Sequence, residues 1–152
     1  MSTRATLPIA GLATALLAVL VAAGVATSPA AAHPPDPVPP TDGALSWGDN
    51  NAGQLGDGST AERHVPGPVS LPDNAALTQL DAGVSHTLAL TLDGRVLAWG
   101  GNIDGQLGDG TQLNRSTPVE VELPAAAEIT DISAGRNHSL AVTSGGGVLA
   151  WG

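Results

Sequence analysis

The sequence contains two nearly identical stretches, WGDNNAGQLGDG at residues 47–58 and WGGNIDGQLGDG at residues 99–110. They begin 52 residues apart, and a third Trp-Gly pair follows at the same interval, at residues 151–152. Aligning residues 47–98 with residues 99–150 needs no gap, and 26 of the 52 positions are identical. A fixed period near 50 residues is typical of solenoids, β-propellers and other repeat arrays. The spacing therefore indicates an internal duplication.

Each unit of the repeat contains the pattern of four short β-strands, separated by Gly, Pro, Asn and Asp. In one unit the predicted strands lie at residues 94–100, 117–123, 127–133 and 138–146. In the second of these strands Val and Leu alternate with Glu, which is the two-residue period of a half-buried strand. Leu140 and Val142 also share one face, whereas Ile129 and Ile132 are three residues apart and give a weaker pattern. Four strands per unit match one blade of a β-propeller.

Four motifs recur in register in the two units. A Trp-Gly pair ends a predicted strand, and Asn-x-x-Gly-Gln-Leu-Gly-Asp-Gly follows at residues 50–58 and 102–110. A strand that begins with proline lies at residues 118–123. Ala-Gly-x-x-His runs at residues 82–91 and 134–143 complete the set. In this combination the chain resembles the regulator of chromosome condensation (RCC-type) repeat family.

The resemblance covers residues 44–152. It implies an all-β fold, a seven-bladed β-propeller of four-stranded antiparallel blades. The chain would hold about two blades and the first strand of a third, in units 44–95, 96–147 and 148–152. The residues of the repeated motifs are then expected to be structural. They are Trp47, Gly48, Gly53, Gln54, Leu55, Gly56, Asp57, Gly58, His86, Trp99, Gly100, Gly105, Gln106, Leu107, Gly108, Asp109, Gly110, His138 and Trp151.

The repeated Gly-Gln-Leu-Gly-Asp-Gly hexamer reads as a turn. A Walker loop needs Lys and Ser or Thr after its glycines, but the chain has no lysine, and Asp57 and Asp109 would repel phosphate. A dinucleotide loop needs a following helix, and no helical pattern follows. In a turn, by contrast, the glycines permit positive φ, the Asp caps its own turn and the Leu tucks inward. We expect no cofactor.

A calcium site at the same loop is the alternative, because Asp49, Asn51 and Asp57 supply oxygen atoms. The second copy has Gly101 and Ile103 at the first two of these positions, so the ligand set is not repeated. The glutamate that closes an EF-hand loop is also missing. The sequence therefore favours no metal.

His86 and His138 occupy the same position in their units. We expect each imidazole to hydrogen-bond backbone within its own blade. Ser85 and Ser139 lie nearby in sequence, but no acid recurs at a matching position to complete a catalytic triad. The sequence therefore predicts no catalytic residue and no enzyme.

The tryptophans Trp47, Trp99 and Trp151 have two possible roles. They are either a stacking platform for sugars or peptides, or packing residues between blades. The chain has no Phe or Tyr, so the indoles are its bulkiest apolar groups. This composition favours packing.

The N-terminal region has the pattern of a secretory signal peptide. Arg4 precedes an apolar stretch at residues 7–25, and three alanines end at Ala32. The apolar stretch is close to the ~20 residues that span a bilayer, so an uncleaved membrane anchor is the alternative. We expect a leader at residues 1–32 and a proline-rich linker at residues 33–43. The protein would be secreted or bound to the cell envelope, and its alanine-rich leader is typical of bacteria.

After residue 32 the chain has four Arg, no Lys and all fourteen acidic residues, a formal charge of 4 − 14 = −10. A surface of this charge repels phosphate backbones, so we expect no nucleic-acid partner. The chain has no cysteine, and its stability must come from packing rather than disulfides.

The loops are the expected binding surface, because repeat scaffolds usually bind through them. The candidate residues are Asp49, Asn51, Ile103, Asp104, Gln112 and Asn114. The sequence favours an exported, non-catalytic module that binds an unknown, extracellular protein, and it indicates no small-molecule substrate. Alternatives are a cell-envelope adhesion or carbohydrate-binding propeller and a secreted inhibitor of the β-lactamase-inhibitor type. Guanine-nucleotide exchange, another role in the family, suits neither export nor the negative charge. We expect the further blades of the propeller to lie beyond this stretch of chain or to come from self-association.

Overall fold

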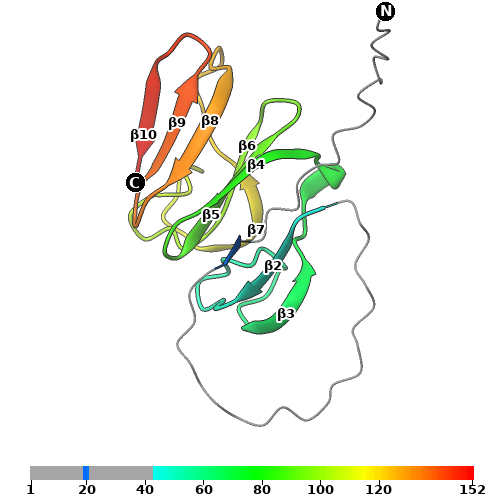
Figure 1. Ribbon diagram of the computed structural model, residues 1–152. Coiled ribbons are helices and arrows are strands. Elements are labelled where there is room, and N and C mark those ends of the chain that lie inside the picture. Colours follow the sequence, from blue (N-terminus) through cyan, green and yellow to red (C-terminus); the bar gives the residue numbers. More distant parts are fainter. Residues whose placement is uncertain (1–18, 21–42) are drawn as a thin grey trace, which may run out of the picture.

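The computed structural model describes residues 19–20 and 43–152. Apart from residues 19–20, the expected leader lies outside the described residues, as does the linker up to residue 42. Within these residues every regular element is a strand except one short 3-10 turn (Figure 1). The elements are β1 (Val19–Leu20), β2 (Leu45–Gly48), β3 (Arg63–Pro68), η1 (Pro72–Asn74), β4 (Leu77–Ala82), β5 (His86–Thr91), β6 (Val96–Gly100), β7 (Arg115–Glu120), β8 (Ile129–Ala134), β9 (Ser139–Thr143) and β10 (Val148–Trp151). In the described part, no helix has the length and hydropathy to cross a bilayer.

The strands form three sheets that follow one another along the chain (Figure 1). The middle sheet has four antiparallel strands in the order β4-β5-β6-β7. The last sheet has the order β10-β9-β8 and is also antiparallel. In the first sheet β2 pairs antiparallel with β3, and β1 pairs parallel with the other edge of β2. The four-stranded sheet is a complete propeller blade, as the sequence predicts.

The blades are offset from the sequence units. Each period of 52 residues holds four strands, β2–β5 and then β6–β9. However, the complete blade runs across the boundary between units 44–95 and 96–147, because its first two strands belong to one unit and its last two to the next. β2 and β3 correspond to the last two strands of a blade, and β8–β10 to the first three. The described residues therefore form one complete blade between two partial ones.

A β-bulge explains the weak pattern of residues 127–133. The pairing of β8 with β9 shifts between Ile129 and Asp131, so one extra residue is inserted. As a result Ile129 and Ile132 point to the same side although they are three residues apart, and they are 8% and 3% exposed. β4 has the same shift between Leu77 and Gln79.

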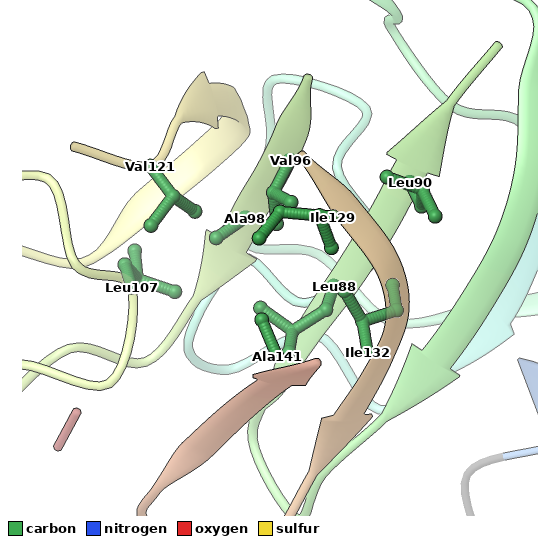
Figure 2. Packing of buried hydrophobic residues seen from close by; sticks show 9 residues of the cluster. All are labelled: Leu88, Leu90, Val96, Ala98, Leu107, Val121, Ile129, Ile132 and Ala141. Carbon is green, nitrogen blue, oxygen red and sulfur yellow. The ribbon is translucent and has the colours of Figure 1, made fainter. Parts of the chain in front are cut away.

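The main core fills the space between the second and third sheets (Figure 2). Leu88 and Leu90 of β5 and Val96 of β6 face Ile129 and Ile132 of β8. Each such aliphatic side chain contributes roughly 1.5–3 kcal/mol when it is fully buried. On its other face the middle sheet packs against the segment around η1 through a second cluster, whose buried members are Ala89, Leu97 and Trp99. Contacts on both faces bury every residue of β5 and β6.

Only one face of β9 reaches this core. Ala141 is completely buried against the middle sheet, and Ser139 on the same face is also buried. Leu140 and Val142 share the opposite face, as the sequence predicts, but within the described residues no sheet covers them. Val142 is 36% exposed.

Candidate functional site

The long loops of the two units lie at one edge of the sheets. One joins β2 to β3 and the other joins β6 to β7. His86, at the start of β5, pairs with Gly100 at the end of β6, so the short β4–β5 turn lies at the same edge. We call residues 49–62, 83–85 and 101–114 the loop edge. It contains all six binding candidates from the sequence: Asp49, Asn51, Ile103, Asp104, Gln112 and Asn114.

A buried asparagine organises the second long loop. The side-chain amide of Asn102 donates to the backbone carbonyls of Thr111 and Leu113, at 3.0 and 3.1 Å, and to Asp109 Oδ1 at 3.0 Å. Its Oδ1 accepts from the backbone N–H of Leu107 at 2.9 Å. Because Asn102 is fully buried, each of these bonds replaces water that cannot reach the site.

Asn50 does the same in the first long loop. Its amide donates to the carbonyls of Ser59 and Ala61, at 3.1 and 3.0 Å, and its Oδ1 accepts from Leu55 N at 2.9 Å. Neither asparagine was among the residues expected to be structural or to bind. The signal that could have revealed their role was the identity of Asn at both positions, three residues before the glycine-rich hexamer.

The aspartates of the hexamer stabilise the two long loops through ion pairs and hydrogen bonds. Asp57 Oδ1 accepts from the backbone N–H of Ser59 at 2.9 Å, and Oδ2 accepts from Arg63 at 2.6 Å. Burial opposes ionisation, but the Ser59 hydrogen bonds and the Arg63 charge outweigh it and lower the pKa of Asp57. Asp109 binds Arg115 at 2.7 Å in the same way. Both carboxylates therefore have partners within the turn.

The other side of the hexamer packs against the next sheet. Leu107 is fully buried in the main core. The carbonyl of Gln106 accepts two hydrogen bonds from the third sheet, one from the Ser139 hydroxyl at 2.7 Å and one from the Trp151 indole N–H at 3.0 Å. The hexamer is thus both the turn of one blade and part of the contact with the following one.

The expectation for His86 was wrong in one respect. Its imidazole bonds to a side chain of the neighbouring blade, Ser139, and not to backbone within its own blade: Nε2 and Oγ are 3.0 Å apart. Because the Ser139 hydroxyl already donates to Gln106, Nε2 carries the proton and donates to the hydroxyl oxygen. The equivalent His138 is exposed, on the side where β9 is uncovered.

The tryptophans lie where the sheets meet. Trp99 is 1% exposed in the second cluster, and its indole N–H donates to the carbonyl of Gln54 at 2.9 Å. Trp151 makes the equivalent bond to Gln106 and packs against the main core. Trp47, in β2, is partly buried. This placement is that of packing residues.

The surface of the loop edge combines apolar and polar groups. Ile103, Leu113 and Val84 are 76%, 64% and 62% exposed. Ile103 and Leu113 lie in the loop that Asn102 organises, and the carbonyl of Leu113 accepts from its side-chain amide. Asp104 accepts a hydrogen bond from Asn137, in the turn between β8 and β9, at 2.9 Å. In the first loop, Asp49 accepts from Asn51 at 2.6 Å. Asn114 accepts from the backbone N–H of Asn102 at 2.9 Å, and Gln112 is exposed.

The geometry of the loop edge and of the Ser139–His86 pair supports binding of a partner surface better than it supports catalysis. Ser139 is fully buried and its proton is directed at Gln106, away from His86, so the pair is not arranged as nucleophile and base. In residues 43–152, no three His, Asp or Glu side chains form a group that could hold a metal ion.

Known proteins share both the repeat and the fold. The family model "Regulator of chromosome condensation (RCC1) repeat" matches residues 42–90 and 93–142, and a second model of this repeat matches residues 77–106. The Arabidopsis thaliana ultraviolet-B receptor UVR8 is 39% identical over 111 residues, which cover 72% of this chain and 25% of the receptor. The mitochondrial RCC1 domain-containing protein RUG3 of the same plant is 38% identical over 107 residues, covering 70% of this chain and 24% of RUG3.

Solved structures agree. Human WBSCR16 superposes with a TM-score of 0.64 and 28% identity, over 73% of this chain and 29% of that one. Yeast RCC1 (Prp20) gives a TM-score of 0.60 and 28% identity, over 72% of this chain and 25% of that one. The chain thus spans about a quarter of the length of these relatives. On the repeated motifs, the blade geometry and these matches, the chain belongs to the regulator of chromosome condensation (RCC1) repeat family.

Proposed function

We propose that this protein is an exported, non-catalytic interaction module that binds a partner protein through its loop edge. The observation that carries the proposal is the combination of exposed apolar side chains with a fixed backbone. Ile103 and Leu113 project from a loop whose backbone is tied to buried Asn102. Large side chains presented on a rigid frame lose little conformational entropy on binding, and this favours affinity.

Relatives support a protein partner. The solved structures that resemble this chain include yeast RCC1 (Prp20), which is bound to Kap60 in one structure and has binding properties to Gsp1p and histones. These partners belong to the yeast protein. The similarity to human HERC6, a probable E3 ubiquitin-protein ligase, covers only 11% of that protein, so no activity is carried over from it.

Export rests on the sequence of the leader, and an extracellular partner follows from it. The absence of catalysis rests on the arrangement of Ser139 and His86 and on the lack of a recurrent acid beside them. The proposal also includes further RCC-type blades that complete the ring, supplied beyond this piece of chain or by a second copy.

The test compares the wild-type chain with Ile103→Asp as immobilised baits for extracellular proteins. We expect a protein captured by the wild type and lost on the variant, since removing a central apolar contact costs ≥2 kcal/mol, a factor of about 30 in affinity. Leu92→Asp is the matched control. Leu92 is 75% exposed but lies in the β5–β6 turn, at the opposite edge of the sheet.

The captured protein is then purified and its affinity is measured by titration calorimetry against the wild type and both variants. Equal binding to all three would exclude the loop edge as the binding site. Binding or turnover of glycans on an array, with no protein captured, would replace the proposal with a carbohydrate-directed function.

A further inference from the structure

The two long loops share a backbone framework but differ in their exposed side chains. In each loop a buried asparagine donates its side-chain amide to two backbone carbonyls at equivalent positions. The residue after this asparagine is Asn51 in the first loop and Ile103 in the second. The second of the two carbonyls belongs to Ala61 in the first loop and to Leu113 in the second. Because the first loop keeps the same bonds with Asn and Ala at these exposed positions, the framework does not require aliphatic side chains there.

In the second loop the two aliphatic side chains are neighbours. The carbonyl of Leu113 accepts from the side-chain amide of Asn102 at 3.1 Å, and the backbone N–H of Asn102 donates to Asn114 Oδ1 at 2.9 Å. These two bonds hold the end of the loop beside its start, where Ile103 follows Asn102. We call Ile103 and Leu113 the aliphatic pair. Single exposed aliphatic residues are common, but an adjacent pair that one loop has and its twin lacks indicates a contact surface.

The second loop is bonded to the turns of two sheets. The N–H of Gly101 donates at 2.7 Å to the carbonyl of Ser85, in the β4–β5 turn that also carries the exposed Val84. Asp104 accepts from Asn137, in the β8–β9 turn, at 2.9 Å. The aliphatic pair is therefore presented on a surface that is fixed before a partner arrives, which lowers the entropy lost on binding.

Negative charge surrounds the aliphatic pair. Among residues 43–152, three of the four arginines form ion pairs with aspartates: Arg63 with Asp57 at 2.6 Å, Arg95 with Asp93 at 2.9 Å and Arg115 with Asp109 at 2.7 Å. The fourth, Arg136, is exposed in the β8–β9 turn. Asp49 and Asp104 accept from the neutral amides of Asn51 and Asn137, which leave the negative charge in place. With a formal charge of −10 after residue 32, the surface attracts cations and repels anions.

We propose that the aliphatic pair binds a cationic protein segment. Apolar side chains of the segment cover Ile103 and Leu113, and its Lys or Arg side chains face Asp104 and the other carboxylates of the loop edge. Apolar contacts at the centre of an interface carry most of the affinity, whereas the surrounding charges select among partners and speed association. The inference rests on the function proposed above and adds the chemistry of the partner.

The experiment selects binders from a phage-displayed library of random cyclic peptides, with the immobilised 152-residue chain as bait. We expect the enriched peptides to share an aliphatic or aromatic residue flanked by Lys or Arg. Their affinity should fall several-fold between about 0.05 and 0.5 M NaCl, because salt shortens the range of charge interactions.

A variant matched to the first loop assigns this binding to the aliphatic pair. Ile103→Asn combined with Leu113→Ala gives the second loop the residues of the first and leaves the net charge unchanged. This double variant should bind the enriched peptides about tenfold more weakly or worse. Its urea unfolding midpoint should stay close to that of the wild type, because the first loop forms the same framework with these residues.

A second pair of variants tests the charge. Asp104→Ala introduces the residue that the first loop has at this position, Ala52, and should weaken peptide binding about two- to fivefold at low salt. Asp73→Asn removes the same charge in η1, at the opposite edge of the sheet, and should leave the affinity unchanged. Asn is suited to this control because residue 73 has a φ of +51°, which Asn tolerates.

Three results would overturn the proposal. One is a selection in which no peptide prefers the wild type to the double variant, and another is enrichment of neutral or acidic peptides. The third is equal weakening by Asp104→Ala and Asp73→Asn, because the charge would then act from the whole surface and not beside the aliphatic pair. Capture of an extracellular protein is measured separately with Ile103→Asp. A protein captured alongside a failed selection would remove only this inference, whereas selected peptides without a captured protein would count against the proposed function alone.

Discussion

His86 Nε2 lies 3.0 Å from the hydroxyl oxygen of Ser139, in the neighbouring blade, and neither residue is more than 1% exposed. Within the described residues His86 Nδ1 has no hydrogen-bond partner. The ring is therefore neutral in the folded state, with its one proton directed across the contact between the blades. The hydrogen bond between the two blades therefore depends on the protonation state of His86.

Acidification is expected to weaken this contact. Burial, with a contribution from His138, lowers the pKa of His86 from 6.5 to about 4. Between these values the unfolded chain binds a proton that the folded chain does not, so stability rises with pH through this window and falls as the pH is lowered. At ~1.4 kcal/mol per pKa unit, the loss on going from pH 6.5 to 4 is at most about 3 kcal/mol. Urea unfolding measured at several pH values tests this.

The control for this titration is His86→Gln, which keeps a donor but does not titrate. The part of the pH dependence between about 4 and 6.5 should disappear, and equal slopes in wild type and variant would contradict the assignment.

The carboxylates of Asp57 and Asp109 affect stability in a different pH range. The pKa values of Asp57 and Asp109 are lowered below 3.8, so their stabilisation is complete above that pH and is lost only as the pH falls further.

Ser139→Ala removes the acceptor for His86 and one of two donors to the Gln106 carbonyl. Leaving the buried imidazole N–H without a partner should cost about 1–3 kcal/mol in the free energy of unfolding. Ser139→Thr is the matched variant, because Thr87 occupies the equivalent position in the previous blade and donates to Gln54. It should retain most of the stability. If both variants unfold at the same urea concentration, the hydroxyl is not the stabilising group.

Asn102→Ala should destabilise the protein by about 2–4 kcal/mol. The change leaves the N–H of Leu107 and the carbonyls of Thr111 and Leu113 without their partner, and each buried group left unpaired costs about 1–3 kcal/mol unless water enters. Gln112→Ala, at an exposed position in the same loop, should change the unfolding midpoint very little. Asn102→Ala should also weaken partner capture, because the loop that presents Ile103 loses its internal support.

The sequence predicted the parts of the fold that repeat themselves. Strand positions, the turn at the hexamer and the packing of Trp99 follow from local patterns that occur twice in register. The residue at which each blade begins could not be predicted from the sequence. A repeat has no intrinsic starting residue, and only the pairing of the strands defines which four of them form one sheet. The partner of His86 was missed for a related reason. Ser139 lies 53 residues away, so the bond exists only once neighbouring blades pack.

Substitutions of two glycines in the hexamer distinguish the cost of backbone strain from the cost of overpacking. Both have left-handed backbone, with φ of +86° at Gly105 and +64° at Gly108. A Cβ at Gly105 would meet no atom within 4 Å, whereas at Gly108 it would lie 2.7 Å from the Trp151 indole nitrogen and 2.9 Å from Val121. Gly105→Ala should therefore cost only the strain of about 1–2 kcal/mol. Gly108→Ala adds overpacking of typically 1–3 kcal/mol.

Urea unfolding of the two variants measures the difference, and tryptophan fluorescence identifies its source. Displacing the Trp151 ring should break its 3.0 Å bond to Gln106 and shift the emission of the folded Gly108→Ala protein to longer wavelength, while Gly105→Ala keeps the native spectrum. Both substitutions add a methyl group at a left-handed position, and only at Gly108 does that group meet the indole. Equal stabilities and equal spectra would mean that the indole does not pack against the hexamer, and the contact between blades would then need another explanation.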